Sequence, residues 1–417
     1  MSRILLLTLV FSPDGVSTAQ LMSELASDLR ARGHELTVLT ATPHYNVESE
    51  ARASQPLRPL FGGLVYESEY HGIPVYHARV PSKSGRLGGR VGGYAVFHAI
   101  STVAGLVLGK RFDVILAPSP PLTIGLSATL LSRWWRIPFI FNVQEIYPDI
   151  AVHLGLLRNR SVIRATEFVE RLVYERASAV VVISDWFRRI LRAKGVPDHK
   201  LRVIPNFVDV DFMQPQPRDN DFARHHGLHD RFVVLYAGNI GLTQGFETIL
   251  ESARALRDLQ DVCFVIIGDG VRQAWLRSEI TALGLRNVLL LNYQPRSLVP
   301  QIYATSDLCL VPLKRGAAWG TFPSKIYTIM AAGRPALVVA DADSEAAWLV
   351  AEAECGFLVP PENPAALAET IRNAYRDRHG LPGLGDNGRR YVVAHHSRET
   401  VARQYDQLIQ SVVSAEP

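Results

Sequence analysis

Short runs of branched apolar residues alternate along the chain with longer stretches in which apolar residues recur at helical spacing. The first run is Ile4 to Val10. A helical stretch from Thr18 to Arg32 follows, closed by Gly33, and then a second apolar run from Leu36 to Thr40. A strand, an amphipathic helix and another strand in succession are typical of βαβ units in a parallel sheet. The sequence therefore predicts an α/β protein.

The same alternation continues in two blocks. The first block has further predicted strands at Val114 to Ala117, Phe139 to Val143 and Ala179 to Ile183. The second block has predicted strands at Phe232 to Tyr236, Cys263 to Ile267, Val288 to Leu291, Leu308 to Val311, Ala336 to Val339 and Phe357 to Val359. Two such blocks predict two doubly wound sheets, which bind ligands at the carboxyl ends of their strands. We expect both domains to face one central cleft.

The segment between the blocks, Ile204 to Arg218, carries three prolines and is typical of an interdomain linker. We predict a first domain over residues 1–205, a linker over 206–218 and a second domain over 219–395. A C-terminal helix within 396–417 follows a Gly/Asp/Asn-rich stretch and is expected to pack back on the first domain. Residues Asn46 to Gly93 do not follow the alternation, and we expect an elaborated loop region there.

Composition excludes several classes of protein. The 417 residues are 47% hydrophobic and 20% charged, which is typical of a folded protein, and the formal net charge of +4 does not indicate a nucleic-acid binder. The three cysteines, Cys263, Cys309 and Cys355, lie in apolar stretches without CxxC spacing. This pattern favours a reduced, cytoplasmic protein without structural zinc. The N-terminal apolar run is interpreted as a buried strand, because Pro13 follows where a signal-peptide cleavage site would be needed.

A lysine at the start of a predicted helix is the most informative single position. Pro323, Ser324 and Lys325 open a helix that ends at Gly333. A cation in the first turn opposes the helix macrodipole and costs on the order of 0.3 kcal/mol. A bound diphosphate reverses that effect, so we interpret Lys325 as an anion contact. A solvated surface lysine is the alternative.

Three glycine-containing loops follow predicted strands. The loop from Ala237 to Gly245 predicts close approach of a ligand to the backbone, although it is not a GxGxxG fingerprint. The loop Gly268-Asp269-Gly270 is more typical of a plain turn. In the first block, Gly15 precedes a helix whose free amides suit an anion, and an ordinary turn is the alternative.

A loop in the first block combines Glu145, Tyr147 and Asp149 after a predicted strand. We choose Glu145 as the group that orients or deprotonates an acceptor. Asp149 is equally consistent with capping the next helix. The isolated histidines His44 and His153 are expected to be structural or to contact a sugar, rather than to bind a metal.

Two DxD triplets, Asp209-Val210-Asp211 and Asp341-Ala342-Asp343, raise the question of a metal, because paired carboxylates chelate Mg²⁺ together with a diphosphate. The first triplet lies in the predicted linker, and the second follows a predicted strand, where Asp commonly begins a turn. We assign neither to a metal and expect no cofactor. HExxH, P-loop and GxSxG motifs do not occur in the sequence.

Six further segments form a joint pattern: Phe11 to Pro13, Arg32 to Val38, Val203 to Asp209, Tyr236 to Asn239, Met330 to Pro335 and Cys355 to Pro361. Over almost the entire chain, this pattern resembles the retaining glycosyltransferases of family 4, which have the GT-B fold. Pro118 to Leu122, Glu145 to Pro148 and Pro323 to Lys325 resemble a bacterial sub-group within that family. The sub-group contains colanic-acid fucosyltransferases and L-fucosamine (N-acetylfucosamine) transferases of surface-polysaccharide biosynthesis.

The resemblance implies metal-free transfer of a fucose-type or N-acetylated amino deoxysugar from a nucleotide diphosphate, with UDP favoured. The acceptor is then a lipid-diphosphate-linked saccharide or an oligosaccharide of O-antigen, capsule or exopolysaccharide assembly. The first domain is expected to bind this acceptor through His44, Tyr147 and His153. Glu145 and Lys325 are expected to be catalytic, with Lys325 stabilising the leaving diphosphate. The expected donor-binding residues are Gly15, Gly238, Asn239, Gly241, Gln244, Gly268, Tyr293, Pro323, Ser324, Tyr327 and Thr328.

Four positions depart from the broader family. Asn239 and Gln244 occupy the positions of the usual phosphate-binding Arg and Lys. Gly320 and Thr328 occupy those of two Glu residues that commonly hold the donor sugar and ribose. The narrower sub-group shares these changes, so the resemblance still implies an active enzyme in which Lys325 neutralises charge.

The most apolar segment, Val91 to Leu108, is too diluted by glycine and polar residues to predict a membrane span. The region from Arg79 to Lys110 is expected either to face the inner surface of the plasma membrane or to form a buried helix with a basic loop. The expected location is therefore cytoplasmic and peripheral to that membrane. Two other functions stay open, a nucleotide-sugar epimerase that needs no acceptor and a non-catalytic nucleotide-binding scaffold.

Overall fold

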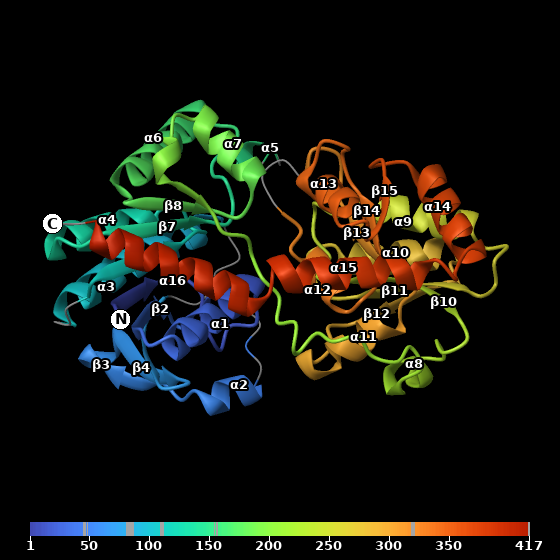
Figure 1. Cartoon of the computed structure of the whole chain (residues 1–417), viewed down its shortest axis with the longest axis horizontal. Coiled ribbons are helices and arrows are strands. Elements are labelled where there is room, and N and C mark those ends of the chain that lie inside the picture. The colour runs from blue at the N-terminus through green and yellow to red at the C-terminus, as the bar shows by residue number, and fades with distance from the viewer. Residues whose placement is uncertain are drawn as a thin grey trace. The chain divides into compact units, whose positions relative to one another are not determined.

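The computed structural model describes residues 1–44, 47, 49–80, 87–108, 112–153, 155, 157–317 and 322–415. The chain forms two compact units (Figure 1). Unit 1 contains Met1–Asn206 and Arg398–Pro417, and unit 2 contains Phe207–Ser397. The chain therefore passes from one unit to the other twice, after Asn206 and after Ser397.

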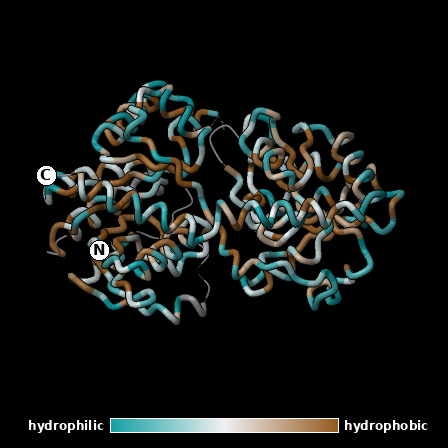
Figure 2. Tube along the Cα trace, viewed as in Figure 1, coloured by the Kyte–Doolittle hydropathy of each residue, from teal (hydrophilic) through white to brown (hydrophobic). Residues whose placement is uncertain are grey.

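Unit 1 is built on a sheet whose strands in the described residues follow the order β3-β4-β5-β2-β1-β6-β7-β8-β9. They are β1 (Arg3–Leu7), β2 (Glu35–Ala41), β3 (Arg58–Leu60), β4 (Val65–Tyr70), β5 (Ile73–Ala78), β6 (Val114–Pro118), β7 (Phe139–Val143), β8 (Ala179–Val182) and β9 (Leu201–Val203). All neighbouring strands are parallel except β3 with β4 and β4 with β5. The central strands are buried along almost their whole length, which explains their continuous apolar runs (Figure 2).

The expectation of a loop region over Asn46 to Gly93 is wrong for the described part of that segment. It contains α2 (Ser49–Ser54), β3, β4 and β5, and β5 pairs with β2 in the main sheet. β4 and β5 form a hairpin that turns at His71 and Gly72, both of which have positive φ. A hairpin needs no crossover helix, so the alternation of strand and helix that revealed the other strands is missing here.

Helices of unit 1 cover both faces of its sheet. They are α1 (Ser17–Ala31), α2, α3 (Leu87–Val107), α4 (Ile124–Trp135), α5 (Asp149–His153), α6 (Arg160–Arg176), α7 (Asp185–Ala193) and α16 (Arg398–Ser414). The C-terminal helix α16 packs on α1, where Arg398 forms an ion pair with Asp28 at 2.7 Å. Among the described residues, no helix has the length and apolarity needed to cross a membrane.

Unit 2 contains a parallel sheet with the strand order β12-β11-β10-β13-β14-β15 in the described residues. Its strands are β10 (Phe232–Ala237), β11 (Val262–Ile267), β12 (Val288–Leu291), β13 (Leu308–Pro312), β14 (Ala336–Val339) and β15 (Gly356–Val359). Its helices are α8 (Asp221–His225), α9 (Phe246–Ala255), α10 (Gln273–Ala282), α11 (Val299–Thr305), α12 (Lys325–Ala331), α13 (Glu345–Glu352), α14 (Pro364–Arg376) and α15 (Leu381–His395). Two apolar clusters pack on the faces of this sheet.

The Gly/Asp/Asn-rich stretch before α16 is helical and forms most of α15. Its glycines let α15 approach its neighbours closely. A Cβ at Gly385 would lie 2.1 Å from the carbonyl oxygen of Gly333, and one at Gly388 would lie 3.0 Å from the Cβ of Cys355. Close packing therefore compensates for the low helix propensity of glycine.

The segment predicted as a linker is packed on unit 2. Arg389 donates hydrogen bonds to the carbonyl oxygens of Val210 at 2.9 Å and Met213 at 2.7 Å. Arg334 donates to the carbonyl oxygen of Gln216 at 3.2 Å. Hydrogen bonds from a charged donor are stronger than neutral ones, so these arginines hold the segment in place.

Candidate active site

Two glycine loops meet at the carboxyl edge of the sheet in unit 2. Gly238 follows β10 with φ 143°, and Gly268 follows β11 with φ 152°, values that favour glycine. A Cβ at Gly268 would lie 1.9 Å from the carbonyl oxygen of Gly238. The second loop therefore supports the first, and a side chain at Gly268 would force them apart.

The backbone of the first loop is fixed by hydrogen bonds. The N–H of Ile240 donates to the carbonyl oxygen of Asp269 at 2.7 Å, and the N–H of Arg272 donates to that of Ile240 at 3.1 Å. The hydroxyl of Tyr236 donates to the carbonyl oxygen of Asn239 at 2.5 Å. Hydrogen bonds from β10 and from the segment after β11 therefore fix the conformation of this loop.

Lys325, the first residue of α12, brings its ammonium to this loop. Its Nζ lies 4.0 Å from the centre of the Tyr236 ring and 2.7 Å from the position of a Cβ built on Gly238. Burial lowers the pKa of Lys325 to about 7. Within the described residues, no carboxylate forms an ion pair with this ammonium. A partly buried cation beside a glycine backbone is suited to an anionic ligand.

Asn239 and Gln244 are neutral side chains that build the same loop. The Oε1 of Gln244 accepts a hydrogen bond from the N–H of Gly241 at 3.0 Å, and its Nε2 donates to the hydroxyl of Thr243 at 2.9 Å. The Nδ2 of Asn239 lies 2.7 Å from the position of a Cβ built on Gly241. The structure therefore brings Gly238, Asn239, Gly241, Gln244, Gly268 and Lys325 together.

The other predicted donor residues differ in exposure. Pro323 and Ser324 are half-buried directly before α12, and Thr328 is half-buried on it. Tyr293 follows β12 and is 56% exposed. Tyr327 is buried in the core of unit 2, where its ring stacks on His396 with centres 4.1 Å apart. The ring of Tyr327 therefore packs in this core, and the expected donor contact of Tyr327 stays a prediction.

In unit 1, Glu145 follows β7 and is half-buried. Burial raises the pKa of its carboxyl, and a hydrogen bond with Tyr147 partly offsets this rise. A carboxyl with a raised pKa beside a hydroxyl donor is suited to accept or release a proton. The structure thus brings two predicted residues, Glu145 and Tyr147, into contact.

Asp149 is the first residue of α5, and its carboxylate forms an ion pair. The ammonium of Lys194 forms ion pairs with Asp149 and with Glu170, the latter at 2.7 Å. His153 is exposed at the end of α5, and its Nδ1 lies 2.9 Å from the carbonyl oxygen of Asp149. The ion pairs hold the start of α5, four residues beyond Glu145.

Gly15 is exposed in the loop between β1 and α1. Beside it, the buried carboxylate of Asp14 accepts a hydrogen bond from the N–H of His44 at 2.7 Å. This bond joins the loops that follow β1 and β2. Asp14 was not predicted as a site residue, because Asp next to Gly is common in ordinary turns.

A chain of three hydrogen-bonded amide side chains beside Glu145 was also not predicted. The Nδ2 of Asn142 donates to the hydroxyl of Tyr405 at 2.7 Å, and the Oδ1 of Asn142 accepts from Gln144 at 3.1 Å. The Oε1 of Gln144 accepts from Asn206 at 2.8 Å. Asn142 is fully buried within β7, and this polar residue in an apolar strand was the available signal. Its partner Tyr405, on α16, is 263 residues away in sequence.

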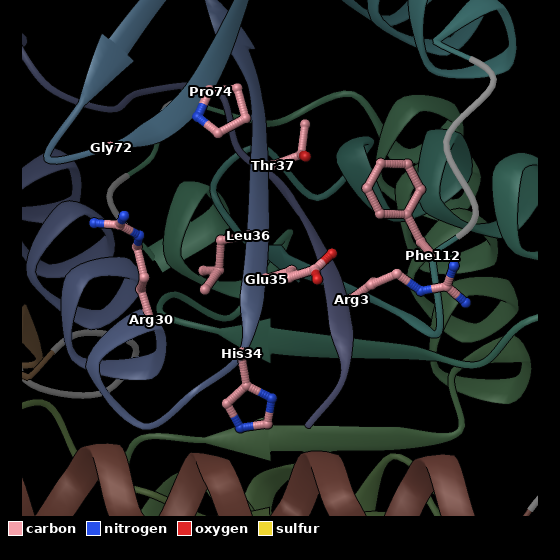
Figure 3. Close-up of a pocket in the computed structure, with 9 residues that line it drawn as sticks. All are labelled: Arg3, Arg30, His34, Glu35, Leu36, Thr37, Gly72, Pro74 and Phe112. Atoms are coloured by element: carbon pink, nitrogen blue, oxygen red, sulfur yellow. The ribbon is translucent and has the colours of Figure 1, made fainter.

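A cavity of about 450 Å³ lies at the opposite edge of the sheet in unit 1 (Figure 3). It is lined by Arg3 and Glu35, which begin β1 and β2. Two of its charged or titratable groups already have partners, since Arg3 pairs with Asp113 at 2.7 Å and His34 contacts Asp406 at 3.0 Å. Doubly wound sheets bind ligands at the other end of their strands, so we assign no role in the reaction to this cavity.

In both DxD triplets, the first carboxylate stabilises a loop by accepting hydrogen bonds from backbone N–H groups. Asp209 accepts hydrogen bonds from the N–H groups of Asp211 and Phe212 at 3.1 and 2.8 Å, and Asp341 accepts one from Gly316 at 2.7 Å. In the part of the chain that the structure describes, no group of three or more His, Cys, Asp or Glu side chains is placed to hold a metal ion. Gly320 lies outside the described residues.

Comparison with known proteins supplies the family. Residues 18–206 match the model described as Glycosyl transferase 4-like domain, and residues 217–407 match the model described as Glycosyl transferases group 1. The chain belongs to glycosyltransferase family 4. This glycosyltransferase is therefore an enzyme, and the predicted GT-B fold is confirmed.

One relative of the glycosyltransferase spans almost its whole length, and another spans about two thirds of it. It is 29% identical over 416 residues to a protein of Escherichia coli K12 named as a colanic acid biosynthesis glycosyl transferase, WcaI, with 97% of this chain and 98% of that one covered. A Pseudomonas aeruginosa protein named as a glycosyltransferase, WbjE, is 28% identical over 271 residues, covering 63% and 66% of the two chains. The fold is similar to that of Anabaena HepE in complex with UDP, with a TM-score of 0.73, 19% identity and coverage of 98% and 100%.

Proposed function

We propose that this glycosyltransferase transfers a sugar with retention from a UDP-linked donor to a lipid-diphosphate-linked or oligosaccharide acceptor. The proposed sugar is fucose-type or an N-acetylated amino deoxysugar, and the product is a bacterial surface polysaccharide such as O-antigen or capsule. The observation that carries the proposal is the ammonium of Lys325 beside Gly238. The name of the E. coli relative and the UDP bound to HepE support the type of product and the nucleotide.

Unit 2 is the proposed donor-binding unit. When the bond between the anomeric carbon and the diphosphate breaks, negative charge develops on the leaving UDP. The Lys325 ammonium and backbone amides of the Gly238 loop stabilise that charge, and this requires no metal. Because burial holds the pKa of Lys325 near 7 in the free protein, arrival of the diphosphate favours uptake of a proton there.

Unit 1 is the proposed acceptor-binding unit. The acceptor hydroxyl attacks the anomeric carbon on the face from which UDP departs, and its proton passes to the carboxylate of Glu145. Tyr147 orients that carboxylate through their hydrogen bond. His44 and His153 contribute hydrogen bonds to the acceptor sugar, and Gly15 approaches the donor phosphates.

The proposed acceptor also sets the location of the enzyme. A lipid-diphosphate carrier is anchored in the membrane and the nucleotide sugar is dissolved in the cytoplasm. The enzyme therefore works as a peripheral protein at the inner face of the plasma membrane. The region assigned to this contact, Arg79 to Lys110, is described by the structure at residues 79–80 and 87–108.

The test is a panel of UDP- and GDP-sugars incubated with the full chain, with and without a lipid-diphosphate-linked amino sugar. Nucleotide release is followed together with product mass, and the anomeric configuration of the product is read by NMR. We expect UDP to appear only with acceptor, which gains one sugar with the donor's configuration. Conversion of a donor without acceptor would identify an epimerase. Nucleotide binding without turnover would identify a scaffold.

A further inference from the structure

Helix α3 carries apolar residues on its solvent face. Val96, Ala99, Val103 and Val107 are exposed, and their spacing places them along one stripe of the helix. Val103 is 58% exposed and Val107 is 56% exposed. The sequence from Val91 to Leu108 contains no charged residue. A surface helix ordinarily carries polar and charged residues on its outer face. This exposed apolar stripe therefore indicates a binding surface.

Helix α4 lies beside α3 and adds exposed apolar residues next to this stripe. It packs beside α3, since the Nε2 of His98 lies 2.7 Å from the hydroxyl of Thr123 and a Cβ at Gly105 would lie 3.0 Å from Leu131. Because these contacts follow the same order along both helices, α3 and α4 run parallel. The exposed side chains near the end of α4, Leu130 at 59% and Trp134 at 71%, therefore lie at the same end as Val103 and Val107.

We call these six residues the α3–α4 surface: Val96, Ala99, Val103, Val107, Leu130 and Trp134. Positive charge lies beside it. Arg133 and Arg136 flank Trp134, are exposed, and have no ion-pair partner among the described residues. α6 packs on α4, as shown by the position of a Cβ built on Gly125, 2.3 Å from Val173.

α6 carries two more exposed arginines, Arg164 and Arg171, which form no ion pair within the described part of the chain, and one exposed carboxylate between them, Glu167. The two units also differ in charge. By sequence, unit 1 contains 26 Lys and Arg against 19 Asp and Glu, and unit 2 contains 18 against 21. The formal net charges are therefore +7 and −3, so the excess of positive charge lies in the unit with the apolar surface.

We propose that the α3–α4 surface docks the enzyme on an anionic lipid bilayer. The apolar stripe enters the interfacial layer, Trp134 lies at the level of the headgroups, and Arg133 and Arg136 contact lipid phosphates. A second copy of this chain would also cover the apolar residues, but it would bring the same unpaired arginines together. Charge complementarity therefore favours an anionic bilayer as the occupant. The inference extends the location proposed above to a specific surface and rests on it for its biological context.

Flotation of the full chain with vesicles tests this surface without any substrate, so its result is separate from that of the transfer assay. Vesicles of phosphatidylcholine alone are compared with vesicles that also contain phosphatidylglycerol. We expect binding to the anionic vesicles, with about tenfold weaker partitioning for Trp134→Ser. We expect about fivefold weaker partitioning for Arg136→Glu, which salt also reproduces.

Trp348→Ser and Arg277→Glu, exposed positions in unit 2, are the matched controls and should partition like the unaltered chain. Circular dichroism of each variant establishes that it is folded. No binding of the unaltered chain to anionic vesicles would overturn the proposal. So would equal loss in the control variants. Dimerisation in sedimentation experiments that Trp134→Ser abolishes, without vesicle binding, would instead identify the surface as a contact between copies.

Discussion

At the scale of single residues, burial decides the chemistry of the two groups proposed to act in transfer. It lowers the pKa of Lys325 and raises that of Glu145, because in both cases it disfavours the charged form. The pKa of each group is thereby shifted toward neutral pH. Binding of a ligand or a proton at either site then changes the charge of that side chain.

The affinity for UDP should depend on pH through Lys325. Below about pH 7 the lysine is already charged, whereas above it UDP binding must be accompanied by proton uptake, so affinity should fall about tenfold per pH unit. Isothermal titration calorimetry between about pH 7 and 9, in buffers of different ionisation enthalpy, measures both effects. Lys325→Arg should bind without this dependence, and Lys325→Met should bind weakly at every pH. A constant affinity in the unaltered enzyme would contradict the assignment.

Replacement of Glu145 should impair transfer and spare donor binding. Glu145→Gln keeps the shape but cannot accept a proton, so we expect kcat to fall by about 10²-fold or more with unchanged affinity for UDP. In the unaltered enzyme the rate should decrease on acidification through the raised pKa of this carboxyl. Initial rates with lipid-linked acceptor measure both. Glu167→Gln, an exposed glutamate on α6, is the control, and a fully active Glu145→Gln enzyme would exclude the role.

At the scale of elements, contacts between loops and helices far apart in sequence hold the site residues. The loop after β11 supports the loop after β10 through Gly268, and α16 reaches β7 through Tyr405. Both contacts lie beside residues proposed to act in transfer. Their loss should therefore be measurable as stability as well as activity.

Gly268→Ala should destabilise unit 2. The new methyl group would clash with the carbonyl oxygen of Gly238, so we expect the free energy of unfolding to fall by about 2 kcal/mol or more. Urea denaturation measures the change. Gly383→Ala is the control, because a Cβ there meets nothing within 4 Å and helix propensity should make it neutral or stabilising. Equal stability of the two variants would show that the loops do not depend on this contact.

Tyr405→Phe should destabilise unit 1 by about 1–3 kcal/mol. It removes the acceptor of Asn142 and leaves a buried amide hydrogen without a partner. Urea denaturation again measures this loss. The matched control is Tyr375→Phe, whose hydroxyl contacts Asp261 at 3.3 Å in an exposed position, so its effect should stay within about 0.5 kcal/mol. An equal loss of unfolding free energy in both variants would show that the buried hydrogen bond contributes no more to stability than the exposed one.

At the scale of the whole molecule, the proposed division of labour assigns the donor to unit 2 and the acceptor to unit 1. UDP alone should therefore slow amide hydrogen exchange in unit 2, in the loops Ala237 to Gly245 and Gly268 to Gly270. Exchange detected by mass spectrometry measures this for both units at once. Lys325→Met should lose most of the protection. Protection confined to the Gly15 loop of unit 1 would place the donor in the other unit.

Local pattern was sufficient for most of the fold. Phe139–Val143, Val288–Leu291 and Ala336–Val339 are strands with the predicted bounds, because an apolar run of that length between turns has few other structures available. The hairpin of β4 and β5 was missed, since the half-exposed β4 lacks a continuous apolar run and no crossover helix connects it to β5.

The sequence by itself determined the parallel strands of the two sheets, the family and the selection of Lys325 and Glu145, because these depend on residue type and spacing along short segments. Only the tertiary structure decided which of these residues meet. It placed Lys325 beside Gly238, stacked Tyr327 on His396 in the core and joined Asn142 to Tyr405. Contacts of this kind arise when distant segments pack together, and their energy depends on burial and distance, which no local pattern contains.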